Sequence, residues 1–277
     1  MGLYISSLNS GSNGNCYYIG NDDEAVLIDA GISCRETEKR MKRLGLSMQK
    51  VKAIFVSHEH GDHISGIPVL ARKYSLPVYI TSNTLRNCHF ESKPGVVYSF
   101  SAGQAVSIGN LSVTAFSKYH DAGDPHSFVV SFEKITVGIF TDLGIVCKNL
   151  IKHFKQCHAA FLESNYDEEM LEEGTYPLHL KNRIRGGEGH LSNTQALQLV
   201  IDHKPTFMSH LLLSHLSKNN NDPELVKNLF SRIAGTTEIL VATRYNETPV
   251  LHIQSSAGKH TAREIRTKNE ILQLSLF

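Results

Sequence analysis

The most informative stretch of this sequence is His58-Glu59-His60-Gly61-Asp62-His63, which directly follows the strand-like run 53–57. In an extended or turning segment, residues two apart point the same way, so His58 and His60 can converge on one ion. The chain then turns at Gly61, where Asp62 and His63 can face a second ion beside the first. Imidazole and carboxylate ligands suit Zn, Mn or Fe. The hexad therefore predicts a metal site at the carboxyl end of a strand.

Composition narrows the class of protein. The chain has 277 residues, of which 41% are hydrophobic and 20% charged, as in a globular protein. Its net charge of +1 excludes a wholly basic surface for nucleic acid but permits a local basic patch. No apolar run approaches the ~20 residues of a membrane span, so we expect no membrane partner. The five cysteines contain no CxxC pair, which favours a reducing cytoplasm over a disulfide framework.

Short runs rich in Val, Ile, Tyr and Phe dominate the first half of the chain and predict strands. Helical patterns lie at residues 33–44, 66–74, 193–202 and 223–233, and further strands are expected at 206–214 and 238–242. This mixture predicts one α/β or α+β domain with two sheets over residues 1–254, followed by a polar C-terminal tail at 255–277.

The hexad resembles the signature of the metallo-β-lactamase superfamily. That resemblance implies a four-layer αββα sandwich, in which helices flank two mixed β-sheets. It also assigns roles to later residues: Asp29 would orient the histidine ligands, His120 would complete the first site, Asp142 would bridge both ions and His215 would complete the second site. Each match is weak alone, but all four fall in the family's order at the ends of strand-like runs. The implied first site comprises His58, His60, His120 and Asp142, and the second comprises Asp62, His63, Asp142 and His215.

Other motifs discriminate between branches of the superfamily. Redox di-iron members place a Glu where this chain has His60, and the stretch after His120 lacks the Pro-Gly-His-Thr-x-Gly motif of thioester hydrolases resembling glyoxalase II. Gly189-His190-Leu191-Ser192 instead resembles the His element of the nuclease branch, as in RNase Z. In that branch the histidine pairs with a glutamate and protonates the leaving oxygen, and Glu163 occupies the matching strand end. The alternative is that Glu163 and His190 are ordinary polar residues at helix termini.

The chain resembles the YycJ (WalJ) family of bacterial metallo-β-lactamase-fold proteins in motifs spread over residues 3–253, among them HEHGDHISG (58–66), SKYHDAGDP (117–125), ESNYDEEML (163–171) and HLSKNNND (215–222). This resemblance implies a metal-dependent phosphodiesterase that acts as a 5′ to 3′ DNA exonuclease linked to mismatch repair. Two divalent ions, Zn or Mn, would lower the pKa of a bridging water, and Asp62 would orient the resulting hydroxide. His190, kept protonated by Glu163, would donate a proton to the leaving 3′ oxygen.

Residues after the last ligand are candidates for binding substrate. The last predicted ligand is His215, and shortly after it come Ser217, Lys218 and Asn219. We expect these three residues to hold a phosphate oxygen or the DNA backbone. The local basic stretch around Lys181 and Arg185 is either a phosphate track or a solvated loop.

The C-terminal residues Gln273-Leu274-Ser275-Leu276-Phe277 look like the short peptide by which bacterial replication and repair proteins bind the sliding clamp. Leu274, Leu276 and Phe277 would anchor in an apolar groove, and the Gln273 amide would orient the peptide. The alternative is an amphipathic strand or helix packed on the domain.

Two other functions compete with a nuclease. A small-molecule hydrolase acting on an ester, a lactone or a cyclic nucleotide would be indifferent to DNA length. A non-catalytic clamp or nucleic-acid adaptor would carry a spent metal site. The complete ligand set argues against the adaptor, because a spent site has no need of both Asp62 and Asp142.

Overall fold

The computed structural model describes residues 2–88 and 96–255. The candidate clamp-binding residues Gln273, Leu274, Leu276 and Phe277 lie outside the described residues, so the division into domain and tail stays a prediction. Across the described ranges, no helix has the length and apolar character needed to cross a membrane.

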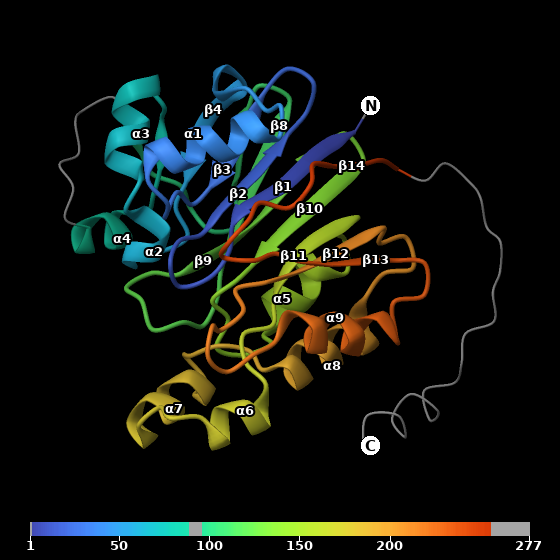
Figure 1. The fold of residues 1–277 in the computed structure, drawn as a ribbon. Coiled ribbons are helices and arrows are strands. Elements are labelled where there is room, and N and C mark those ends of the chain that lie inside the picture. Colours follow the sequence, from blue (N-terminus) through green and yellow to red (C-terminus); the bar gives the residue numbers. More distant parts are fainter. Residues whose placement is uncertain (1, 89–95, 256–277) are drawn as a thin grey trace.

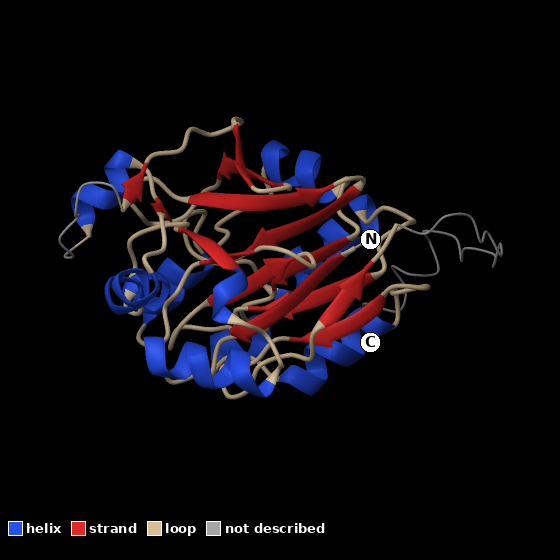
Figure 2. Ribbon diagram, turned by 90° about the horizontal axis from the view of Figure 1, so that it is seen from above, coloured by secondary structure: helices blue, strands red, loops and turns tan. Residues whose placement is uncertain are grey.

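Two seven-stranded mixed sheets pack face to face (Figures 1 and 2). The first sheet has the spatial order β14 (Leu251–Ile253), β1 (Leu3–Asn9), β2 (Cys16–Gly20), β3 (Ala25–Ile28), β4 (Val51–Phe55), β5 (Val78–Tyr79) and β6 (Val97–Tyr98). The second has the order β13 (Glu238–Val241), β12 (His210–Ser214), β11 (Ala159–Glu163), β10 (Ile135–Phe140), β9 (His126–Phe132), β8 (Leu111–Ser117) and β7 (Ala105–Ile108).

Helices cover the outer face of each sheet, as Figure 2 shows. The helices are α1 (Cys34–Arg43), α2 (Gly61–Ile64), α3 (Ile67–Tyr74), α4 (Ser82–Asn87), α5 (Lys148–Phe154), α6 (Glu168–Glu173), α7 (Leu178–Arg185), α8 (Asn193–His203) and α9 (Pro223–Ser231), with a short 3₁₀ turn at Met48–Lys50. Three apolar cores separate the layers. One lies between the sheets, and the other two lie beneath the flanking helices on either side. These four layers confirm the predicted α/β sandwich.

The carboxyl ends of the strands that precede the predicted ligands gather at one edge of the sandwich. β3 pairs in parallel with β4, and β10 to β13 pair in parallel in succession. β8 and β10 both run antiparallel to β9, so they point in the same direction. Residues that follow these strands therefore emerge on the same side of the molecule.

Two local predictions differ from the structure. The strand predicted at 206–214 begins only at His210, because Pro205 lacks an N–H group and its carbonyl accepts a hydrogen bond from the Met208 N–H in a turn. The basic stretch that includes Lys181 and Arg185 is helix α7, not a loop, although none of its residues is buried.

Candidate metal centre

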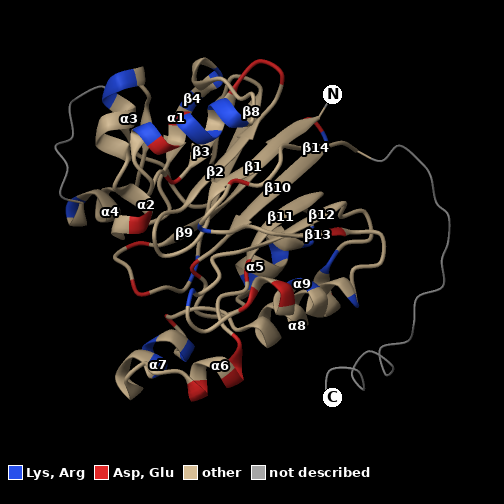
Figure 3. Ribbon diagram, viewed as in Figure 1, with Lys and Arg blue, Asp and Glu red and all other residues tan. Residues whose placement is uncertain are grey.

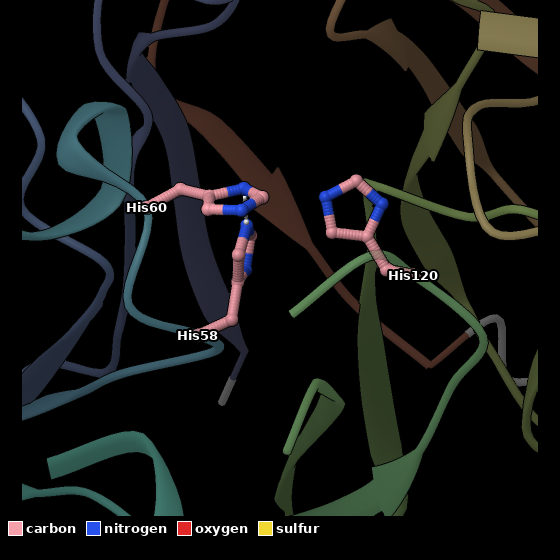
Figure 4. A group of neighbouring side chains, drawn as sticks. All are labelled: His58, His60 and His120. Atoms are coloured by element: carbon pink, nitrogen blue, oxygen red, sulfur yellow. Dashed lines mark hydrogen bonds between the residues drawn. The ribbon is translucent and has the colours of Figure 1, made fainter. Parts of the chain in front are cut away.

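The structure brings together all seven residues predicted to bind metal. Figure 4 shows the rings of His58 and His60, which follow β4, facing the ring of His120, which follows β8. One nitrogen from each of these rings lies within 4.8 Å of the others. The same limit holds for two further groups, one of His58, His63 and Asp142 and one of Asp62, His63 and His215.

Asp142 lies between the two sets of histidines. Its carboxylate oxygens are 3.3 Å from His63 Nε2, 3.4 Å from His215 Nε2 and 3.9 Å from His120 Nε2. The Asp142 side chain is 2% exposed and is therefore shielded from bulk solvent. This position suits the bridging role that the superfamily resemblance assigns to it.

The side chains fit divalent ions because several buried ligand atoms have no other partner. Within the described ranges, His120 Nε2, His215 Nε2 and Asp142 Oδ2 are buried and make no hydrogen bond. A buried polar atom without a partner is costly, and a bound cation would satisfy all three. Imidazole nitrogens and carboxylate oxygens together are the donor set of Zn and Mn sites.

Asp29 orients two of the histidines from behind. Its carboxylate accepts hydrogen bonds from Ser57 N (2.8 Å), Ser57 Oγ (2.8 Å) and His63 Nδ1 (2.7 Å). Ser57 Oγ in turn lies 2.8 Å from His58 Nδ1. These contacts fix both ring orientations and leave the Nε2 atoms directed at the centre.

Backbone strain is found at three residues of the centre that follow the ends of their strands. Asp29, Asp142 and His215 adopt left-handed φ angles of 59°, 56° and 58°. Such conformations cost of order 1–3 kcal/mol for a residue other than glycine. A glycine also permits one close approach here, because a Cβ on Gly31 would lie 1.6 Å from the carbonyl oxygen of Asp62.

The predicted pair of Glu163 and His190 is present. His190 Nδ1 lies 2.7 Å from Glu163 Oε1, which is also 3.1 Å from His215 Nδ1. The other carboxylate oxygen accepts hydrogen bonds from the Leu143 and Leu191 N–H groups. Glu163 is fully buried, whereas the His190 side chain is 21% exposed and reaches the surface beside Asp142. Glu163 therefore orients a predicted metal ligand as well as the predicted proton donor.

Burial and neighbouring charges shift the pKa values of the histidines and of the carboxylates in different ways. Burial lowers the pKa of His58 far below its usual range and the pKa of His120 to about 4, which keeps both rings neutral and able to bind a cation. Burial opposes ionisation of Glu163, but the charge and hydrogen bonds of His190 and the hydrogen bond of His215 hold its pKa at about 2. Burial also opposes ionisation of Asp62, but the charge of His63 together with the hydrogen bond and charge of His215 holds its pKa at about 2.

The predicted substrate residues lie beside the centre, although two of them already have partners. Ser217 Oγ accepts a hydrogen bond from Asn220 N (3.3 Å), and Asn219 Nδ2 donates to Tyr176 OH (3.1 Å). Lys218 is exposed. Their roles in binding stay predictions.

The basic residues of α7 are paired with acidic neighbours. Arg183 pairs with Asp121 and Arg185 pairs with Glu172, whose carbonyl also accepts a hydrogen bond from Lys181. The structure therefore does not favour α7 as an open phosphate track.

Sequence reasoning missed three polar residues that contact the centre. Ser57 links Asp29 to His58, and Asn15 Nδ2 lies 3.1 Å from both Asp62 Oδ2 and His63 Nε2. Asn165 Nδ2 donates to the carbonyl oxygen of His215 (2.7 Å). Proximity in sequence was a signal for two of them, since Ser57 precedes the hexad and Asn165 follows Glu163 by two positions, whereas Asn15 lies far from the hexad in the sequence.

The fold and this centre define a metallo-hydrolase of the beta-lactamase superfamily. Residues 24–215 match the family model described as "Beta-lactamase superfamily domain". Among solved structures, the metallo-beta-lactamase fold protein YhfI from Bacillus subtilis has a TM-score of 0.70 at 15% identity, covering 90% of this chain and 99% of that chain.

Curated relatives narrow the family further. "Exodeoxyribonuclease YycJ" from Bacillus anthracis is 37% identical over 236 residues, which cover 84% of this chain and 89% of the relative. "Exodeoxyribonuclease WalJ" from Streptococcus pneumoniae is 31% identical over 230 residues, with 81% and 86% covered. The chain belongs to the YycJ/WalJ family of the superfamily, which confirms the resemblance seen in its motifs.

Proposed function

We propose that this chain is a metal-dependent exodeoxyribonuclease that removes nucleotides from DNA in the 5′ to 3′ direction. The observation that carries the proposal is the hydrogen-bonded Glu163–His190 pair at the surface of the metal centre. A proton donor in this position suits a reaction whose leaving group is a poorly acidic sugar oxygen. The names of the YycJ and WalJ relatives support DNA as the polymer.

The proposed metal ligands are His58, His60, His120 and Asp142 for one ion and Asp62, His63, Asp142 and His215 for the other. Divalent ions held there supply Lewis-acid chemistry, since they lower the pKa of a water and neutralise charge on the phosphodiester. The geometry suits Asp62 for a second task, because its carboxylate lies at the centre and is only partly buried. We propose that it accepts a hydrogen bond from the attacking water and orients it.

His190 would act on the opposite side of the scissile bond. Glu163 accepts a hydrogen bond from its Nδ1, which fixes the orientation of the ring. The Nε2 proton is then the one available to the leaving 3′ oxygen. Ser217, Lys218 and Asn219 follow the His215 segment and would bind the backbone of the strand.

The direct test is digestion of an end-labelled DNA duplex with Mn²⁺ or Zn²⁺ added, with His60→Ala as the control. We expect metal-dependent release of mononucleotides from the 5′ end by the wild type and none by the variant. If the wild type leaves DNA intact with either metal but hydrolyses small phosphodiesters, lactones or cyclic nucleotides, the alternative of a small-molecule hydrolase is correct.

The role of His190 can be tested separately with two leaving groups. His190→Ala should lower kcat on DNA about 10²- to 10⁴-fold, the usual contribution of a general acid. A nucleotide p-nitrophenyl ester has a leaving group that needs no proton, so its kcat should fall far less. His179→Ala, an exposed histidine on α7, is the matched control. Equal losses on both substrates would reject the general-acid role.

Finer features of the function are part of the same proposal. We propose a role in DNA repair, with recruitment to the sliding clamp through Gln273–Phe277. A cytoplasmic location is supported by the five cysteines of the chain, all of which are free thiols. Full-length protein and its Leu276→Ala and Phe277→Ala variants should be compared for binding to the purified clamp. Equal binding by all three would reject the clamp peptide.

A further inference from the structure

We propose that Arg244 and Tyr245 form a subsite for one nucleotide of a single DNA strand. In this subsite the Arg244 guanidinium binds a phosphate and the Tyr245 ring stacks on a base. The proposal rests on the proposed nuclease function, because it places part of the polymer substrate beside the metal centre.

Arg244 lies on the rim of the metal centre. β13 runs parallel to β12, so the segment after β13 emerges beside the segment that carries His215. Arg244 Nη2 donates to the carbonyl oxygen of Leu216 (2.8 Å), and Nη1 lies 3.4 Å from Ser12 Oγ. In the same loop as Ser12, Ser10 Oγ accepts a hydrogen bond from the His215 N–H (2.8 Å). The guanidinium therefore contacts Leu216, the residue that directly follows the predicted ligand His215 in the sequence.

The charge of Arg244 is free to meet an anion. Across residues 2–88 and 96–255, Arg244 forms no ion pair and its bonds go to a carbonyl and a hydroxyl. Arg183 and Arg185 of α7, by contrast, pair with Asp121 and Glu172, and Figure 3 shows basic and acidic residues gathered on α7 and α6. A phosphate can bind Arg244 without breaking an ion pair, which favours this side of the centre over α7.

Hydrogen bonds hold the loop that carries Tyr245 in place, while the Tyr245 ring itself is exposed to solvent. Arg43 binds Glu247 through two hydrogen bonds of 2.7 and 2.6 Å, and Arg40 Nη2 donates to the Tyr245 carbonyl (3.2 Å). The Thr248 N–H donates to the backbone of β1. Tyr245 is nevertheless 66% exposed. A large ring on a fixed loop loses little conformational entropy on binding, and aromatic rings of this kind stack on the bases of single strands.

Gly11 gives the guanidinium its space. It has a φ of 134°, and a Cβ there would lie 3.1 Å from Arg244 Nη2. The loop of residues 10–15 thus contacts Arg244 at one end, while Asn15 contacts Asp62 at the other. One continuous segment connects the proposed subsite to the metal centre.

The experiment measures kcat/KM on single-stranded oligonucleotides that carry one abasic residue at successive positions. For the wild type, one position should be sensitive, with kcat/KM reduced about 5- to 150-fold by loss of a stacked base. Tyr245→Ala should cause a similar loss on the intact strand and abolish the sensitivity at that position. Tyr245→Phe keeps the ring and should restore wild-type behaviour.

The contribution of Arg244 is read from salt dependence. Arg244→Gln keeps an amide that can donate to Leu216 but removes the charge. The slope of log(kcat/KM) against log[salt] should become shallower by about 0.7, the value for one phosphate of a single strand. Phe207→Ala and Arg232→Ala are matched controls, because these residues precede β12 and β13 and lie toward the opposite edge of the sheet. Both should behave as the wild type.

Activity on a small diester such as bis(p-nitrophenyl) phosphate distinguishes a failure of the subsite proposal from a failure of the nuclease proposal. The ratio of kcat/KM on the oligonucleotide to that on the diester should fall in Tyr245→Ala and Arg244→Gln. If the wild type degrades DNA and neither the ratio, the abasic sensitivity nor the salt slope changes, the subsite is wrong and the nuclease proposal stands. If the wild type hydrolyses only the diester, both proposals are overturned.

Discussion

Replacing Asp29 with Asn should weaken metal binding by changing the protonation of a ligand. The carboxylate is 1% exposed and accepts hydrogen bonds from Ser57 N, Ser57 Oγ and His63 Nδ1. An asparagine can still accept from Ser57 N, but its NH₂ group must then face Ser57 Oγ and His63 Nδ1. His63 can accept that bond only by moving its proton to Nε2, the nitrogen that lies 3.3 Å from Asp142.

The expected loss follows from this change of tautomer. Removing a hydrogen-bond partner of a ligating histidine costs about 10- to 100-fold in metal affinity. That loss corresponds to about 1.4–2.7 kcal/mol. The loss of affinity should affect the ion bound by His63, because Asp29 contacts His58 only indirectly, through Ser57.

Competition with a chromophoric chelator would give the affinity and the stoichiometry of the ions. Asp222→Asn is the matched control, because Asp222 also accepts two backbone hydrogen bonds but caps α9 away from the centre, where Asn serves equally well. Unchanged affinity for both ions in Asp29→Asn would refute the orienting role, provided that the protein remains folded.

Three further predictions concern stability and reactivity. Gly31→Ala should lower the free energy of unfolding by more than about 3 kcal/mol, because the new Cβ would overlap the Asp62 carbonyl, whereas Gly187→Ala should change it little. Denaturant titration would measure both variants, and an unchanged free energy of unfolding in Gly31→Ala would contradict the close approach of Gly31 to Asp62. Removing the ions with a chelator should lower the melting temperature, since a ligand at 100 times its Kd stabilises by about 2.7 kcal/mol; a melting temperature that ignores added metal would count against the site. Burial raises the pKa of the Cys16 and Cys157 thiols, so neither should react with iodoacetamide at neutral pH until the protein unfolds, and mass spectrometry of the folded protein would detect any exception.

The sequence was most informative where chemistry and local structure coincide. The hexad at 58–63 predicts both a metal site and its place after a strand, because two-residue spacing and a glycine turn act locally. His120, Asp142 and His215 were harder to assign, since each is a single residue whose partners lie far away in the chain. The superfamily resemblance assigned them, through their order along the chain and their position after strand-like runs, and the ends of strands running in one direction do meet at one edge of the sandwich.

Other parts of the site depend on contacts that no local pattern reveals. Asn15 reaches Asp62 and His63 only because Gly31 lets two backbone segments approach closely. The pairing of Glu163 with His190 was predicted from the resemblance, but the second contact of Glu163, with His215, comes from the parallel pairing of β11 with β12. The short helix α7 escaped prediction because it buries no residue, so its sequence shows no apolar face toward the core.

The placement of the ligands on both sheets links metal binding to the packing of the whole domain. His58, His60 and His63 follow β4 of the first sheet, whereas His120, Asp142 and His215 follow strands of the second. Without ions, the carboxylates of the centre are balanced by nearby histidines. Burial lowers the pKa of His215, but the charge of Asp142 and the hydrogen bonds of Asp62 and Glu163 raise it to about 10. Ions bound between the sheets would replace those protons and tie the two halves together. The left-handed Asp29, Asp142 and His215 would then be held in place from both sides, so metal removal should loosen the edge of the sandwich before its apolar cores.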